Sequence, residues 1–92
     1  MNAQEAEDLE EGLRTAAKAI GGKVVENFEA EVVLPSGHKI TAYPDFDFGE
    51  YTVCLYVPEG EDPWLCESAL TRVGIKTAAD RFREVAAEDS AR

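Results

Sequence analysis

The residues with the widest chemical repertoire in this chain are two cysteines and one histidine: Cys54, Cys66 and His38. A cysteine nucleophile needs an imidazole or a positive field nearby, because the thiolate is the reactive form. His38 falls in a predicted turn at the far end of a sheet from Cys66, and the surrounding sequence is acidic, which disfavours a thiolate. This arrangement argues against a cysteine enzyme.

The same three residues are too few for structural zinc, which takes four ligands, and they lack CxxC or HxxxH spacing. Two cysteines in a cytoplasmic chain are usually reduced and inert. A native disulfide between Cys54 and Cys66 is the alternative. The sequence leaves that choice open.

Two further patterns are similar to ligand-binding loops but fail on spacing. The run 45–49 alternates Asp with Phe, but its glycine comes one position too early for a calcium loop, and Tyr56 stands where that loop needs Glu. Gly21-Gly22 follows a predicted helix, which is typical of a helix stop and not of a phosphate-binding loop. We therefore expect no cofactor, no metal ligand and no catalytic residue, and we predict that the chain is not an enzyme.

Two helices are predicted, one near each end of the chain. The first spans 3–20, because its apolar residues recur every three or four positions, and Gly21-Gly22 supplies its C-terminal stop. The second spans 78–88, with Thr77 as its N-cap. The apolar stripes of the two helices are Ala6, Leu9, Leu13, Ala16, Ala17 and Ile20 in the first, and Ala79, Phe82, Val85 and Ala86 in the second.

Between the helices the apolar period falls to two, which predicts β-strands whose register follows from the turns. A three-residue turn at 35–37 sets Val32 opposite Ile40. A two-residue turn at Gly49-Glu50 sets Tyr43 opposite Tyr56. A loop over 58–62 closes a third hairpin, which sets Tyr56 opposite Trp64 and adds a fourth strand on weaker signals.

The predicted fold class is α+β, a two-layer sandwich. An antiparallel sheet of three or four strands carries the N- and C-terminal helices on one face, in the order α-β-β-β-(β)-α. With 92 residues the chain has room for a single domain, 1–92. The expected helix-facing residues of the sheet are Phe28, Ala30, Val32, Ile40, Ala42, Phe46, Phe48, Val53, Leu55, Val57 and Leu65.

The opposite face of the predicted sheet combines aromatic and acidic side chains. The register aligns Tyr43, Tyr56 and Trp64 in one row across three strands. Aromatic residues flanked by charge are typical of interaction surfaces, although cross-strand aromatic pairs also stabilise small sheets. The carboxylates expected around this row are Glu29, Glu31, Asp45 and Asp47.

Charge narrows the choice of partner. The chain has 19 acidic and 9 basic residues, for a net charge of −10. Most of the excess negative charge lies in residues 26–67, where Lys39 is the one basic residue. Such a field repels nucleic acid and anionic membranes, and it attracts basic protein surfaces. We expect no direct nucleic-acid or membrane partner and, because the acidic N-terminus is unlike a signal peptide, a cytoplasmic location.

Small size, acidity, the lack of a recognised catalytic site and an aromatic, acidic face together resemble the general type of small phage-borne inhibitors, anti-CRISPR and other DNA-mimic proteins among them. The resemblance is one of kind and rests on no particular motif. It implies a non-enzymatic protein-binding module that occupies the basic, nucleic-acid-binding surface of a partner protein. The expected contacts are Glu29, Glu31, Asp45 and Asp47 with basic side chains, and Tyr43, Tyr56 and Trp64 as the anchor.

Two alternatives remain open at this stage. One is a self-associating structural or regulatory subunit, a homodimer, in which the aromatic row is the interface and the charge only maintains solubility. The other is a small enzyme or metal protein, which would need chemistry on Cys54, Cys66 or His38.

Overall fold

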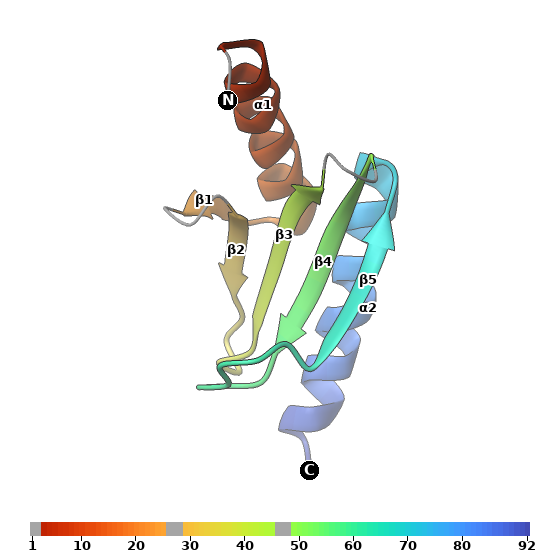
Figure 1. The fold of residues 1–92 in the computed structure, drawn as a ribbon. Helices are drawn as coiled ribbons and strands as arrows, with labels where there is room; N and C mark the ends of the chain where they lie inside the picture. The colour runs from red at the N-terminus through yellow and green to blue at the C-terminus, as the bar shows by residue number, and fades with distance from the viewer. Residues whose placement is uncertain (1–2, 26–28, 46–48) are drawn as a thin grey trace.

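The computed structural model describes residues 3–25, 29–45 and 49–92. It shows an antiparallel five-stranded sheet with strand order β1-β2-β3-β4-β5 and with both helices on one face (Figure 1). This confirms the α+β class, although the sheet has five strands, one more than the largest number predicted. In chain order the elements are α1 (Ala3–Ile20), β1 (Lys23–Val25), β2 (Glu29–Val33), β3 (Lys39–Asp45), β4 (Glu50–Tyr56), β5 (Leu65–Ala69) and α2 (Arg72–Ser90).

Helix α1 has the predicted bounds, and its end is closed in two ways. The N–H of Gly22 donates to the carbonyl of Ala17, and the N–H of Gly21 donates to the carbonyl of Lys18. Gly21 has φ 74°, and together these features form a Schellman motif. The guanidinium of Arg83, on α2, donates to the carbonyl of Ile20. One helix therefore caps the other.

The unpredicted strand is β1, which pairs with β2 at the edge of the sheet. A strand of three residues is too short to show a period of two, so alternation does not reveal it. Gly22 allows this close return of the chain, because a Cβ at that position would lie 2.1 Å from the carbonyl oxygen of Glu31.

Helix α2 begins at Arg72, six residues before the predicted start at 78. Its N-cap is Thr71, whose Oγ1 accepts the N–H of Gly74 at 3.1 Å. The predicted cap, Thr77, lies inside the helix and donates its hydroxyl to the carbonyl of Val73. The prediction missed the first turns because Gly74 looks like a helix breaker and Val73 is exposed, outside the apolar stripe.

The β2–β3 hairpin has the predicted register, with Val32 opposite Ile40 and Ala30 opposite Ala42. Gly37 adopts φ 93° in the turn, a conformation that favours glycine. The β4–β5 hairpin also has the predicted register, with Leu55 opposite Leu65. The uncertain fourth strand of the prediction is therefore real.

The β3–β4 register is different from the prediction. Tyr43 lies opposite Thr52 and not Tyr56, and the last pair is Asp45 with Glu50, so the connection is longer than the two-residue turn we expected. The shift is four residues. Because side chains alternate with a period of two, an even shift keeps every residue on its predicted face, and polarity cannot detect it.

The core lies between the helices and one face of the sheet, and most of its predicted members are buried there. The stripes of α1 and α2 meet Ala30, Ile40, Ala42, Val53 and Leu55, all fully buried. The prediction that Val57, Leu65 and Ala6 belong to the core is wrong, because Val57 and Leu65 are each 36% exposed and Ala6 is exposed on α1. Phe28, Phe46 and Phe48 lie outside the described residues.

Candidate functional site

The sheet face turned away from the helices, which we call the open face, does not carry the predicted aromatic row. Tyr56 lies opposite Lys39, and Tyr43 lies four residues further along β3. At 3.2–3.4 Å per residue this separates the two tyrosines by about 13 Å along the strands. Trp64 precedes β5 and donates its backbone N–H to the carbonyl of Leu55 at 2.8 Å. The three rings therefore do not form one line of neighbours.

The predicted carboxylates are also less available than expected. Glu31 lies 4.0 Å from Nζ of Lys39, and the same ammonium group stands 4.5 Å from the centre of the Tyr56 ring. Glu29 and Asp45 are half-buried near the ends of their strands. Asp47 lies outside the described residues. Lys39 thus compensates part of the negative charge that was expected to face a partner.

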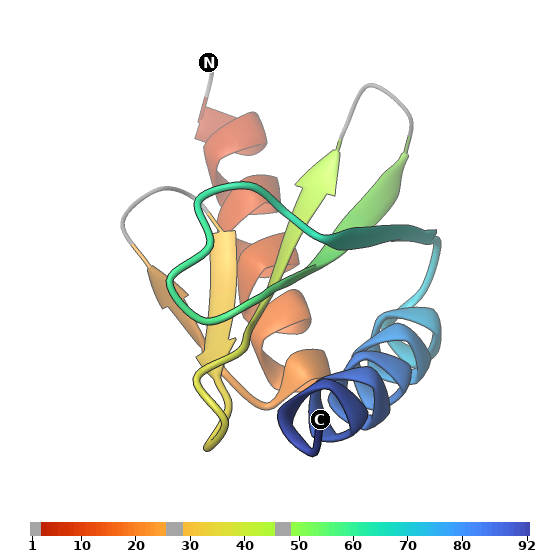
Figure 2. The ribbon, with the colours of Figure 1, turned by 90° about the horizontal axis from the view of Figure 1, so that it is seen from below.

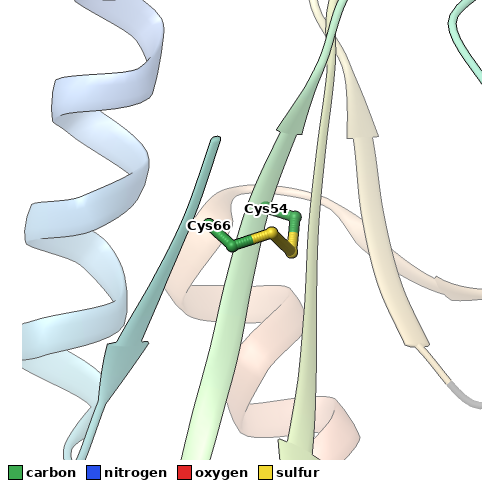
Figure 3. The surroundings of a disulfide bond; sticks show 2 residues. All are labelled: Cys54 and Cys66. Atoms are coloured by element: carbon green, nitrogen blue, oxygen red, sulfur yellow. A yellow bond between two sulfur atoms is a disulfide. The ribbon is translucent and has the colours of Figure 1, made fainter. Parts of the chain in front are cut away.

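The centre of the open face is occupied by a disulfide between Cys54 and Cys66 (Figure 3). The two residues are directly opposite each other on β4 and β5, with Cα atoms 4.2 Å apart. This resolves the choice that the sequence left open against the reduced state. Thr41 lies opposite Cys54 on the other side, and both are buried. The Thr41 hydroxyl has no hydrogen-bond partner within the described part of the chain.

The strongest candidate for a contact surface is the connection between β4 and β5. Three apolar side chains stand exposed where the hairpin ends: Val57 at 36%, Trp64 at 45% and Leu65 at 36%. The loop between them adds three exposed acidic residues. We call these six residues the loop patch: Val57, Glu59, Glu61, Asp62, Trp64 and Leu65.

The loop patch is braced on several sides. The N–H of Gly60 donates to the carbonyl of Val57 at 3.0 Å, which closes a tight turn around Pro58 and Glu59. Pro58 packs beside the β2–β3 turn, since a Cβ on Gly37 would lie 3.3 Å from its ring (Figures 1 and 2). The Cys54–Cys66 disulfide lies one residue pair inside the hairpin. The patch is therefore held in place by the strands beneath it.

Glu59 adopts φ 61°, the left-handed region that glycine or asparagine occupies more easily. A non-glycine residue at the third position of such a turn is strained by about 1 kcal/mol or more. A residue with a side chain cannot replace Gly60, because a Cβ at that position would lie 2.8 Å from Cγ2 of Val57. The fold thus tolerates strain to hold a carboxylate at the tip of the loop.

The acids of the loop differ from those elsewhere. Within the described residues Glu59, Glu61 and Asp62 have no salt-bridge or hydrogen-bond partner. Glu67 pairs with Arg81, and Asp80 pairs with Lys76, whose hydrogen bond lowers the pKa of Asp80 below its ordinary value. The three loop acids are therefore available to interact with an outside cation, and they lie next to exposed Trp64 in the chain.

Sequence reasoning identified Trp64 but missed its acidic neighbours, which it treated only as a connection. A usable signal was present in the pair of prolines, Pro58 and Pro63, that bracket the acids and restrict the loop before the only tryptophan. Stiff loops that carry charge beside an aromatic residue suit recognition better than flexible ones.

No family model, curated protein or solved structure matches this chain. Over residues 3–25, 29–45 and 49–92 there is no helix long and apolar enough to cross a membrane. The same residues include no group of three or more His, Cys, Asp or Glu side chains placed to hold a metal ion. Function must therefore be inferred from the geometry of the chain itself.

Proposed function

We propose that this chain is an acidic protein-binding module whose loop patch occupies a basic surface of its partner. The observation that carries the proposal is the set of unpaired carboxylates beside exposed Trp64, on a loop that the disulfide and two prolines brace. The nearest class of partner is a nucleic-acid-binding protein, because its lysines and arginines are arranged to meet regularly spaced negative charges. Occupying them displaces the nucleic acid, as a DNA-mimic inhibitor such as an anti-CRISPR protein does.

The two kinds of side chain in the patch have different tasks. The indole of Trp64 loses little conformational entropy on binding and supplies apolar contact area, as anchor residues do in protein interfaces. The carboxylates of Glu59, Glu61 and Asp62 attract the partner over a distance of roughly 8–10 Å at physiological salt. Of the seven residues predicted from sequence, Trp64 belongs to this surface, and Tyr56 is next to it in the chain, directly before Val57. Glu29, Tyr43 and Asp45 lie toward the other end of the sheet, and Glu31 lies between them and the loop end.

Binding in the cytoplasm, which we also propose, exposes the disulfide to a reducing environment. Reduction would free β5 from β4 at one point while leaving their paired backbones in place. The binding experiment below is therefore run with and without dithiothreitol, so that the contribution of the bond to binding is measured directly.

The test begins with the immobilised chain and a cell lysate at low and moderate salt, followed by purification of the protein it captures. Binding of that protein to fluorescent DNA is then measured in the presence of the wild-type chain, of Trp64→Ala, and of Glu59→Lys with Glu61→Lys. We expect the wild type to displace the DNA and each variant to need at least tenfold more protein. The matched control is Glu7→Lys with Glu11→Lys, which makes the same change of charge at exposed positions of α1.

The proposal fails if the captured protein binds DNA equally well in the presence of the chain, or if the α1 control loses as much inhibition as the loop variant. Capture that survives high salt, together with a dimeric mass by light scattering that Trp64→Ala makes monomeric, would instead support self-association through the same residues.

A further inference from the structure

A second site lies on the other side of the sheet, where three side chains form a hydrogen-bonded chain. Oγ of Ser36 lies 2.7 Å from Nδ1 of His38, and Nε2 of His38 lies 2.8 Å from Oδ2 of Asp89. The imidazole is 2% exposed, whereas Ser36 and Asp89 are half-buried. The chain joins the β2–β3 turn to the last turn of α2, across 51 residues of sequence.

The neutral imidazole satisfies both contacts in a single tautomer. With its proton on Nε2, the neutral imidazole donates to the carboxylate of Asp89, and its bare Nδ1 accepts the hydroxyl proton of Ser36. A hydroxyl held on the basic nitrogen of an imidazole, whose other nitrogen is fixed by a carboxylate, is the arrangement that activates a serine nucleophile. In the usual serine triad Nε2 contacts the serine and Nδ1 contacts the carboxylate, whereas here Nδ1 contacts Ser36 and Nε2 contacts Asp89. Either ring nitrogen is an effective base when the other carries the proton.

Ser36 also faces space that a small molecule can enter. It lines a shallow groove of about 610 Å³ between the β2–β3 turn and α2, which falls within the size range of small-molecule sites. The walls are mainly apolar and come from Leu34, Pro35, Ala86 and Ala87. Arg83 also lines the groove, where its guanidinium donates to the carbonyl of Ile20 and lies 3.8 Å from the carboxylate of Asp80.

We propose that Ser36 is a nucleophile that accepts the acyl group of small carboxylic esters with a short apolar acyl chain. Oγ of Ser36 attacks the ester carbonyl carbon while its proton passes to Nδ1 of His38. The bond to the alcohol oxygen then breaks, and Nδ1 returns the proton to that oxygen. Water, activated by the same nitrogen, hydrolyses the acyl-serine and releases the carboxylic acid. Asp89 positions the ring and stabilises the imidazolium formed in each step.

This inference is independent of the proposed binding function. The groove belongs to the helix-covered side of the sheet, whereas the loop patch stands at the end of the β4–β5 hairpin. Ser36→Ala tests the ester chemistry and Trp64→Ala tests binding, so loss of one property leaves the other testable.

The test uses a fluorophosphonate, which phosphorylates an activated serine with loss of fluoride. The intact chain is treated with the reagent, digested, and mapped by peptide mass spectrometry. We expect the adduct on Ser36, with Ser90 of the same groove and exposed Ser68 unlabelled, because His38 holds only the hydroxyl of Ser36. Asp89→Asn keeps an acceptor for Nε2 and should slow the labelling at least tenfold.

Hydrolysis of para-nitrophenyl butyrate gives a second readout. We expect Ser36→Ala to abolish turnover and Ser68→Ala to leave it unchanged, with circular dichroism confirming that both variants are folded. No adduct on Ser36 in the folded wild-type chain, or labelling of Ser36 and Ser68 at equal rates, would overturn the proposal. The three side chains would then serve only to fasten the turn to α2.

Discussion

The helix-covered face of the sheet and its open face are held together by different interactions. On the helix-covered face, small side chains such as Ala30 and Ala42 let the alanine-rich stripes of α1 and α2 approach closely, and the residues are fully buried. On the open face the central contact is covalent, the Cys54–Cys66 bond, and ring-bearing residues such as Tyr43 remain exposed. Packing therefore concentrates stability on one face, and the other retains residues that can contact a partner.

The largest effect should come from opening a cavity on the helix-covered face. Ile40 is fully buried, so Ile40→Ala should lower the free energy of unfolding by about 2–5 kcal/mol. Tyr43→Ala, three residues along the same strand but 37% exposed on the open face, should cost less than about 1 kcal/mol. Urea denaturation measures the free energy of unfolding of both variants. Equal losses would show that packing on the open face stabilises the fold as much as packing on the helix-covered face.

An intermediate effect is expected from the disulfide. Its cysteines are 12 residues apart, and a cross-link closing a loop of that length stabilises a fold by about 3 kcal/mol in the chain-entropy model. Dithiothreitol should therefore lower the urea midpoint of the wild type. The double variant Cys54→Ala with Cys66→Ala should start at the lower midpoint and show no response to the reductant. If the wild-type urea midpoint does not change on full reduction, the disulfide does not stabilise the open face.

The smallest effect, and the one of opposite sign, concerns Thr41. Its hydroxyl is buried without a hydrogen-bond partner among the described residues, so Thr41→Val should raise the free energy of unfolding by about 1 kcal/mol. Thr52→Val, at a half-buried position on the same face, should change it by less than about 0.5 kcal/mol. A loss of stability in Thr41→Val, measured by thermal unfolding, would mean that its hydroxyl is satisfied in solution.

Sequence reasoning succeeded where a local signal determines the structure. The glycine pair ends α1 at Ile20, and the turn at 35–37 fixes the β2–β3 register. Sequence reasoning failed for the β3–β4 register. A shift of four residues preserves the alternation of polar and apolar side chains, and that alternation is the only check that the sequence offers on the register. Sequence reasoning also failed at the start of α2, where Thr71 and not Thr77 forms the cap.

The two candidate sites were predictable to different degrees. Sequence analysis predicts Trp64, but it places the carboxylates of the contact surface on strands, whereas the acids of the candidate site lie in the β4–β5 loop. The Ser36–His38–Asp89 chain was invisible, because the second helix was predicted to end at 88 and nothing local indicates that Asp89 reaches the first hairpin turn. Contacts between residues far apart in sequence depend on how the layers pack, which composition and period do not specify.

Arg83 couples the two helices in a way that bears on the dynamics of the fold. Its guanidinium closes the last carbonyl of α1 from the middle of α2, so fraying of the first helix at Ile20 also releases a side chain of the second. We therefore expect amide groups at these two places to exchange their hydrogens with solvent at similar rates. The end of the first helix is thus tied to the second helix, although the two stand at opposite ends of the chain.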